Sequence, residues 1–466
     1  MQSILELSQL LRERKLSPVE LTRDCLANIE KLNPSLNAFI TVTKDSTMAA
    51  ARQAEIEIQQ GKWRGPLHGI PLALKDLIDT AGVPTTAASG VFKDRVPAED
   101  AEIVRRLKTA GAVLLGKQNL HEFAYGGSSI VSYFGAVRNA WDTQRIAGGS
   151  SGGSATAVAT GLGCGAIGTD TSGSIREPAA LCGVVGLKPT YGRVSTRGVI
   201  PLSPSLDHVG PIARTVADAA IILQTIAGFD PGDSRSTNKE VPDYLAALGT
   251  RPTSMRIGVP REFFYEDLNA EVATAMEESL VVFKAMSFDI HEVTLPVPTD
   301  RALQSAEAYA YHAEFAARSP ELYQQETLRR IMTGANINKS KLASHRRELE
   351  QARQEIRAIF EHVDALITPT VPVVAPTIAE LQQDMESLRA RELVLLRNTR
   401  PFNVWGLPAI SVPCGFTQAG LPIGLQIAGP HWGEPRVLQL AYAYEQATGW
   451  HERQPRLLNQ KTPDDA

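Results

Sequence analysis

The residues with the most evident chemistry lie in a stretch of small side chains in the middle of the chain. Residues 148–179 read GGSSGGSATAVATGLGCGAIGTDTSGSIREPA and contain five serines. A serine hydroxyl is a weak nucleophile unless a neighbouring base takes its proton. The structural alternative is that these glycines and serines only mark turns and close packing. For an isolated GGSSGG that alternative is the better interpretation.

Two overlapping matches to GxSxG, at 148–152 and 149–153, point to the nucleophile elbow of α/β hydrolases. That elbow needs a strand directly before it, and an acid and a histidine later in the chain. The preceding NAWDTQRIA does not read as a buried strand. Asp207 and His208 are adjacent in sequence, so they do not supply two separate relay members. These two unmet requirements argue against an α/β hydrolase. His208 is expected to be a structural hydrogen-bonding residue.

GAVLLGKQ, residues 111–118, matches part of a phosphate-binding loop. Its AVLL is strand-like where a loop of free N–H groups is needed, and Gln118 stands where a Ser or Thr would hold Mg²⁺. We therefore interpret this segment as an ordinary turn and strand.

Length, composition and charge exclude several classes of protein. The 466-residue chain is 43% hydrophobic and 21% charged, which is ordinary for a globular protein, and length alone suggests about three domains of roughly 150 residues. The net charge is −4 and no dense Lys/Arg cluster occurs, so direct nucleic-acid binding is not expected. Neither a signal peptide nor a run of about 18 apolar residues is recognisable. We expect a cytoplasmic protein without a membrane span.

Cysteine and histidine spacing predicts neither a disulfide framework nor a zinc site. The four cysteines, at positions 25, 164, 182 and 414, form no CxxC pair, and the nine histidines form no HExxH motif. We expect reduced, buried thiols and no metal.

Apolar periodicity alternates between strand and helix along most of the chain, which predicts an α/β protein with helices covering a largely buried sheet. Residues 300–363 differ, because they are polar, helical in pattern and free of strand signals, which suggests an inserted lobe. Expected strands lie at 38–43, 68–78, 112–116, 255–260, 288–295 and 365–368, and expected helices at 21–33, 47–62, 215–229 and 269–286.

The extended motif resembles the amidase signature family. GGSSGGSATAVATG and GTDTSGSIREPAALCGVVGLKPTYGRVS carry the resemblance, and PLHGIPLALKDLIDTAG, SPSLDHVGPIARTVADAAIILQ and LPAISVPCGF extend it over nearly the whole chain. The resemblance implies a single domain over 1–466, with a mixed central β-sheet covered by helices on both faces. It places the signature core at about 65–230 and a helical cap at about 300–363.

The family uses a Ser-Ser-Lys triad, and the motif positions imply Lys75 as general base, Ser150 as proton relay and Ser174 as nucleophile. Lys75 lies in the apolar run IPLALKDLI, which fits the desolvation that a lysine base needs. The structural alternative is a surface pair of Lys75 with Asp76. The resemblance also implies a cis peptide bond between Gly149 and Ser150. Such chemistry needs no metal or cofactor.

Further site residues follow from the same resemblance. The oxyanion hole is expected from the backbone N–H groups of Thr171, Ser172, Gly173 and Ser174. Ser172 departs from the family's usual glycine, and its hydroxyl could narrow the acyl side of the pocket. Asp170 and Arg176 are expected to form a scaffold, since paired buried charges usually hold loops, and the alternative is that they orient the substrate.

A second loop of the family borders the substrate pocket. It corresponds to Tyr125, Gly126 and Gly127 here. The side chain of Tyr125 is expected either to form part of the pocket wall or to pack in the core, and the sequence leaves both roles open.

The resemblance leaves two functions open. The first is a self-sufficient hydrolase of linear amides, working through a Ser174 acyl-enzyme and water, in a family whose members also cleave carbamates and some esters. The alternative is the glutaminase subunit of a tRNA-dependent amidotransferase, which would pass ammonia to a partner subunit. His208 favours the hydrolase, because that subunit more often has glutamine there. The substrate is expected to be a small amide, and a homodimer is left open.

Overall fold

One mixed sheet of eleven strands forms the centre of the molecule. The computed structural model describes residues 1–250 and 252–459. The strand order across the sheet is β1-β3-β2-β4-β6-β5-β10-β11-β9-β7-β8. The strands are β1 (Phe39–Val42), β2 (Pro71–Lys75), β3 (Val113–Gln118), β4 (Gly165–Asp170), β5 (Val185–Lys188), β6 (His208–Ala213), β7 (Arg256–Val259), β8 (Asp289–Glu292), β9 (Ala365–Pro369), β10 (Ala409–Phe416) and β11 (Pro422–Ala428).

The pairing around β2 brings three strand ends to one edge of the sheet. β2 pairs in parallel with both β3 and β4, and its sequence PLALK is buried along its whole length, as expected of an interior parallel strand. Lys75 lies opposite Gln118 of β3, and Leu74 lies opposite Ile167 of β4. Because parallel strands end at the same edge, the residues that follow β2, β3 and β4 can converge there.

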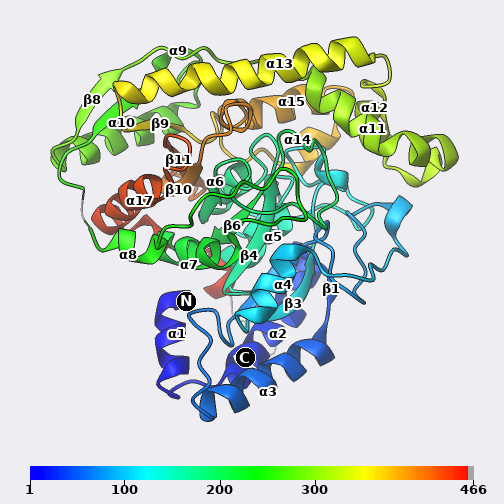
Figure 1. The fold of residues 1–466 in the computed structure, drawn as a ribbon, viewed down its shortest axis with the longest axis vertical. Helices are drawn as coiled ribbons and strands as arrows, with labels where there is room; N and C mark the ends of the chain where they lie inside the picture. Colours follow the sequence, from blue (N-terminus) through cyan, green and yellow to red (C-terminus); the bar gives the residue numbers. More distant parts are fainter. Residues whose placement is uncertain (251, 460–466) are drawn as a thin grey trace.

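Helices cover both faces of the sheet, which confirms the predicted α/β architecture. α5 and α6 pack together on one face, and α7, α10 and α17 pack together on the other. Figure 1 shows α1, α2 and α3 at the opposite end of the molecule from the long helix α13. The helices are α1 (Ile4–Arg12), α2 (Pro18–Leu36), α3 (Lys44–Gln59), α4 (Glu102–Thr109), α5 (Gly152–Ala159), α6 (Arg176–Cys182), α7 (Val216–Ile226), α8 (Tyr244–Leu248), α9 (Arg261–Phe264), α10 (Ala270–Ala285), α11 (Ala302–Arg318), α12 (Gln325–Met332), α13 (Lys339–Glu355), α14 (Ile378–Gln382), α15 (Leu388–Leu395), α16 (Pro401–Val404) and α17 (Glu434–Thr448).

The small residues of α5 let this helix lie directly on neighbouring backbone. Every residue of its sequence GGSATAVA is buried. A Cβ atom at Gly153 would lie 2.4 Å from the carbonyl oxygen of Asn119 and 2.5 Å from that of Ala38. No side chain fits at such distances. Close packing, the structural alternative to a catalytic role for this stretch, therefore explains part of its small-residue composition.

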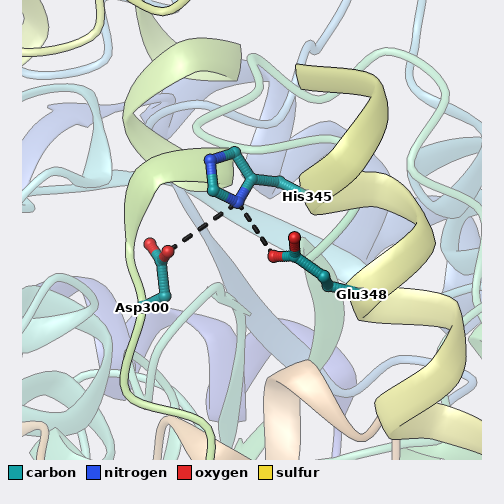
Figure 2. Close-up of side chains that lie close together, drawn as sticks. All are labelled: Asp300, His345 and Glu348. Carbon is teal, nitrogen blue, oxygen red and sulfur yellow. Dashed lines mark hydrogen bonds and ion pairs between the residues drawn. The ribbon is translucent and has the colours of Figure 1, made fainter. Parts of the chain in front are cut away.

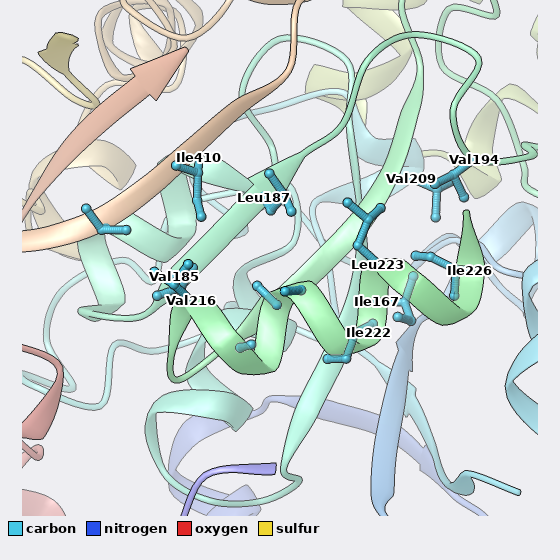
Figure 3. Close-up of a cluster of buried hydrophobic side chains, with 14 of the residues drawn as sticks. Ile167, Val185, Leu187, Val194, Val209, Val216, Ile222, Leu223, Ile226 and Ile410 are labelled. Carbon is cyan, nitrogen blue, oxygen red and sulfur yellow. The ribbon is translucent and has the colours of Figure 1, made fainter. Parts of the chain in front are cut away.

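The main core lies between α7 and the central strands. The sequence of α7, VADAAIILQTI, is apolar on nearly all sides, which is typical of a buried helix. The hydroxyl of Thr215 caps its first turn by accepting from the N–H of Asp218 at 3.1 Å. Figure 3 shows apolar side chains from β4, β5, β6, β10 and α7 in contact, among them Ile167, Val185, Leu187, Val209, Ile222, Ile226 and Ile410.

Between β8 and β9 the chain is helical, as its sequence predicted. α11 contacts both α12 and α13, and no strand interrupts them in this described segment. The division into a signature core and a cap remains a prediction. No helix in the described part of the chain is long and apolar enough to cross a membrane.

We expect Ile222→Ala to lower the free energy of unfolding by about 2–5 kcal/mol, because it removes apolar atoms from a fully enclosed position. Urea unfolding followed by tryptophan fluorescence measures the change. The control is Val281→Ala on α10, whose side chain is 65% exposed and whose loss should change stability by less than about 0.5 kcal/mol. Equal effects of the two variants would contradict the central place of α7 in the core.

Candidate active site

Three segments meet at the edge where β2, β3 and β4 end. Lys75 is the last residue of β2, and Asp170 is the last residue of β4. The loop 171–175 follows β4 and leads into α6. The turn before α5 reaches the same edge, because the N–H of His121, after β3, donates to the carbonyl of Ser150 at 3.1 Å. Ligand sites of α/β sheets commonly lie at this edge.

The side chain of Lys75 ends between a serine and a threonine. Its Nζ lies 2.7 Å from Ser150 Oγ and 2.9 Å from Thr169 Oγ1, with the Thr169 carbonyl at 3.5 Å. The peptide bond between Gly149 and Ser150 is cis. The structure thus brings together Lys75 and Ser150, which are 75 residues apart in the chain.

Lys75 is completely buried, and burial sets its protonation. Burial lowers the pKa of Lys75 to about 7, although the negative charges of Asp170 and Asp207 act in the opposite direction. The adjacent Asp76 is not its partner, because an oxygen of that carboxylate lies 3.4 Å from Lys117 Nζ. The surface pair of Lys75 with Asp76 is therefore wrong. What remains is an amine that can gain and lose a proton near neutral pH.

Two residues from the disfavoured motifs have structural contacts. Lys117, in the segment that resembled a phosphate-binding loop, is buried in β3 and donates to the Ile78 carbonyl and the Thr85 hydroxyl, each at 2.7 Å. His208 is also buried, with Nδ1 at 2.6 Å from the carbonyl of Leu206. The side chains of Lys117 and His208 therefore have hydrogen-bond partners within the protein.

Ser174 lies in the loop between β4 and α6, directly beside the Ser150 turn. The N–H of Ser151 donates to the carbonyl of Ser174 at 3.2 Å, and Ser174 is only 3% exposed. All three residues of the predicted triad therefore converge on one edge of the sheet. Their catalytic roles remain predictions.

The carboxylate of Asp170 holds the loop that carries Ser174. It accepts from the N–H of Gly173 at 2.8 Å and of Ile175 at 3.1 Å, and it pairs with the Arg176 guanidinium at 3.0 Å. Burial by itself would raise the pKa of Asp170, but the charge and hydrogen bonds of Arg176, the charge of Lys188 and a hydrogen bond from Asn403 together outweigh it, and the pKa is lowered. Arg176 also donates to the Thr399 carbonyl and to the side chains of Gln426 and Asn403. These contacts fit the scaffold role expected of this charged pair.

The loop offers three of the four predicted oxyanion donors. The N–H of Gly173 is already used by Asp170, so it is not free to bind a substrate oxygen. For the N–H groups of Thr171, Ser172 and Ser174, the described residues provide no acceptor. Gly173 has a different function: its φ of +136° suits glycine, and a Cβ there would lie 2.0 Å from Thr399 Oγ1.

Ser172, the residue that departs from the family pattern, ties this loop to the helical segment. It is not among the residues with positive φ, so serine fits without backbone strain. Its hydroxyl donates to Gln304 Oε1 of α11 at 3.1 Å, and its carbonyl accepts from Thr399 Oγ1 at 2.7 Å. Any effect of this hydroxyl on the acyl side of the pocket remains a prediction.

The predicted pocket loop lies in the same region and is fully buried. Tyr125 is 2% exposed, and its hydroxyl oxygen lies 3.4 Å from Ser305 Oγ of α11. Gly126 packs against the imidazole of His121, and Gly127 is buried beside it. Tyr125 therefore contacts the same helix as Ser172 does.

Sequence reasoning missed two groups that hold the Lys75 and Ser150 pair in place. One is Thr169, which contacts Lys75 Nζ. The other is Glu177, whose Oε2 accepts from the N–H of Gly149 at 2.6 Å, and burial raises the pKa of Glu177 well above its usual value. Both residues lie inside the serine-rich motif, where Thr169 precedes Asp170 and Glu177 follows Arg176. Their position next to the predicted scaffold pair was the signal that could have identified them.

One group of side chains in the described chain has donor spacing that could suit a metal ion. Figure 2 shows His345 on α13 between the carboxylates of Asp300 and Glu348, with Nδ1 at 3.7 Å and 3.1 Å from their oxygens. The three residues line a cavity of about 240 Å³. Both acids are exposed, and exposed acidic groups commonly gather without a bound cation.

A buried lysine beside one serine, and a second serine on a loop clamped to a mixed sheet, define a class of amide-cleaving protein. Residues 20–438 match the family described as Amidase, and the chain therefore belongs to the amidase signature family. This confirms the family that its motifs predicted.

Similar proteins include both amidotransferase subunits and a hydrolase. The chain is 42% identical to a glutamyl-tRNA(Gln) amidotransferase subunit from Geotalea daltonii, over 98% of this chain and 99% of that one. The structure of 6-aminohexanoate cyclic dimer hydrolase matches with a TM-score of 0.90 and 31% identity, over 98% of this chain and 99% of that one. The corresponding amidotransferase subunit from Thermotoga maritima matches with a TM-score of 0.79 and 34% identity, over 96% of this chain and 94% of that one.

The pKa of Lys75 predicts how turnover depends on pH. A base works only when deprotonated, so kcat/KM for a simple amide should rise about tenfold per pH unit below 7 and level off above about 8. Steady-state rates between pH 5 and 9 measure this profile.

Burial also raises the pKa of Asp207, to about 6, so this carboxyl needs a control. If Lys75 is the titrating group, Asp207→Asn should keep the rising limb but shift it to lower pH, because loss of the Asp207 charge lowers the pKa of Lys75. Loss of the limb in that variant, or a flat profile in the unmodified protein, would contradict the assignment.

Proposed function

We propose that this protein hydrolyses a linear amide through an acyl-enzyme on Ser174. One observation carries the proposal: an amine with a pKa near 7, that of Lys75, lies 2.7 Å from Ser150 Oγ, beside the loop of Ser174. An amide has a poor leaving group, so its cleavage needs an activated nucleophile, a stabilised oxyanion and a proton for the departing nitrogen. Each need has a candidate at this edge of the sheet.

The proton path of the proposed reaction begins at Ser174. Ser150 takes the proton of the Ser174 hydroxyl while it gives its own to the neutral Lys75 Nζ, and Ser174 Oγ forms a bond to the carbonyl carbon. The carbon–nitrogen bond then breaks as the proton returns through Ser150 to the leaving nitrogen. Water attacks the resulting ester by the same route, which releases the acid and restores Ser174.

The oxyanion of each tetrahedral intermediate would lie against the loop after β4. The N–H groups of Thr171, Ser172 and Ser174 are its candidate donors, and losing one such donor typically slows a reaction by about 10²–10³-fold. The Asp170 carboxylate fixes the loop from behind through Gly173 and Ile175. The donors would therefore be held in position before the substrate binds.

The glutaminase subunit of a tRNA-dependent amidotransferase is the second candidate, and the comparisons favour it over the self-sufficient hydrolase. Near full-length relatives at 41–42% identity are amidotransferase subunits, whereas the hydrolase structure with the TM-score of 0.90 is 31% identical. His208 remains the residue that favours the hydrolase. Its imidazole contacts the backbone carbonyls of Leu206 and Asp170, where it supports the fold.

The two candidates differ in what the isolated chain can do. Ammonia release from glutamine and from simple alkyl amides, measured without tRNA, ATP or a second protein chain, distinguishes them. Efficient cleavage of simple amides supports the self-sufficient hydrolase. Glutamine cleavage that depends on partner chains and tRNA supports the amidotransferase role.

Serine substitutions test the proposed triad. Ser174→Ala should abolish turnover because the nucleophile is lost, and Ser150→Ala should lower kcat by about 10²–10⁴-fold because the proton relay is lost. Both are measured by ammonia release from the best amide found.

The matched control is Ser154→Ala on α5, whose buried hydroxyl has no hydrogen-bond partner in the described structure. This variant should keep turnover within about twofold of the unmodified protein. A Ser174→Ala protein as active as this control would refute the acyl-enzyme.

A further inference from the structure

Guanidinium groups gather beside Tyr125. The Arg389 guanidinium lies over the Tyr125 ring, 5.4 Å from its centroid. Arg301 precedes the first turn of α11, four residues before Ser305, whose hydroxyl oxygen is 3.4 Å from that of Tyr125. The N–H of Ser305 donates to the carbonyl of Arg301 at 3.1 Å, so Arg301 lies at the end of α11 from which Ser305 meets Tyr125.

Arg301 and Arg389 have no hydrogen-bond acceptor in the described structure. Arg301 and Arg389 are both partly buried, and neither guanidinium has a hydrogen bond or ion pair with a described residue. Arg301 Nη1 is fully enclosed and has no partner among those residues. Arg400, by contrast, donates to the backbone carbonyls of Pro298 and Asp300. Buried polar groups are nearly always paired in proteins, so the enclosed nitrogen of Arg301, with the unpaired Arg389 near it, calls for a missing partner.

The missing partner is expected to be an anion. Burial lowers the pKa of Arg301 well below its usual value, and the positive charges of Arg400 and Arg389 lower it further. Burial, and then the charge of Arg330, lowers the pKa of Arg389. Like charges in a buried site repel one another, and a carboxylate would neutralise them while it accepts paired hydrogen bonds.

The start of α11, which Arg301 precedes, is linked to the loop that carries Ser174. Gln304, three residues after Arg301, accepts from the hydroxyl of Ser172, which is two residues before Ser174. An amide carbon at Ser174 and an anionic group at the arginines could therefore belong to one small linear molecule.

The carboxylates nearby are already engaged. Glu326 and Glu392 lie 2.9 Å and 2.6 Å from nitrogens of Arg330. The Asp300 carboxylate accepts from the N–H of Ala302. The two carboxylates that act on Arg389, those of Glu326 and Glu392, are therefore not available to bind a substrate ammonium group.

We propose that Arg301 and Arg389, beside Tyr125, bind the carboxylate of a linear amide substrate that carries no ammonium group next to it. The inference rests on the proposed function, because it assigns a substrate class to the same site. Its substrates are ω-amido carboxylates, in which a short chain separates the carboxylate from a primary amide. Arg301 and Arg389 are then specificity-determining residues.

Three matched amides test this proposal. Glutaramate has the amide and the terminal carboxylate, pentanamide lacks the carboxylate, and glutamine adds an ammonium group to glutaramate. We expect kcat/KM to be at least about 30-fold higher for glutaramate than for either of the others, since a buried charge pair commonly contributes that much. Ammonia release from the full-length protein measures all three.

Variants identify the groups responsible. Arg301→Gln and Arg389→Gln should each lower the ratio of kcat/KM for glutaramate to that for pentanamide by about 10-fold or more, mainly through the KM of glutaramate. Arg347→Gln, which removes an exposed arginine of α13, is the matched control and should leave the ratio unchanged. Equal kcat/KM values for glutaramate and pentanamide, or a ratio that neither site variant changes, would overturn the proposal.

A binding measurement separates this proposal from the proposed function. Titration calorimetry with glutarate should detect binding to the unmodified protein and to Arg347→Gln, and binding at least about 10-fold weaker to Arg301→Gln. If no amide is cleaved but glutarate binds in this pattern, the proposed function fails and the anion site stands. If amides are cleaved but glutarate does not bind, or binds all variants alike, the anion site fails and the proposed function stands.

Discussion

The burial of one lysine amine without an acidic partner is the constraint on which the site depends. An ammonium group in that position would be costly, and burial therefore brings the pKa of Lys75 to about 7. Among the described residues, Nζ directly contacts only Ser150 and Thr169, which are uncharged. The adjacent acid is turned away, because Asp76 is paired with Lys117. The parallel pairing of β2 with β3 and β4 imposes this burial from both sides.

A second buried charge, on Asp170, fixes the position of the loop that carries Ser174. Its carboxylate binds two N–H groups of the loop that carries Ser174 and the guanidinium of Arg176, which reaches across to the chain after α15. Removing one partner of such a buried pair commonly costs about 3–5 kcal/mol, because the other charge is left uncompensated. A neutral hydrogen bond from Ser172 to Gln304 links the loop to α11. The helical segment between β8 and β9 is thereby connected to the loop of Ser174.

Much of the fold could be predicted because its signals are local. Apolar runs indicated β2, β3 and β9, and the polar helical pattern marked the segment that contains α11 to α13. Lys75, Ser150 and Ser174 followed from a family motif, since no periodicity relates them. What could not be predicted depends on the folded arrangement: the Asp170 carboxylate occupies the N–H of Gly173 within one loop, and the charges of Arg301 and Arg389 come close only through folding. Sequence spacing carries no information about such convergence.

The proposed chemistry depends above all on the protonation of Lys75, and NMR measures that protonation most directly. In protein labelled with ¹³C-lysine, the Cε resonance of Lys75 is identified by its absence from a Lys75→Arg variant and is followed from about pH 5 to 11. We predict a midpoint near pH 7, where an ordinary lysine titrates at about 10.4. A midpoint at or above about pH 10 would contradict the proposed mechanism, because Lys75 would then be a permanent cation and could not accept the proton of Ser150.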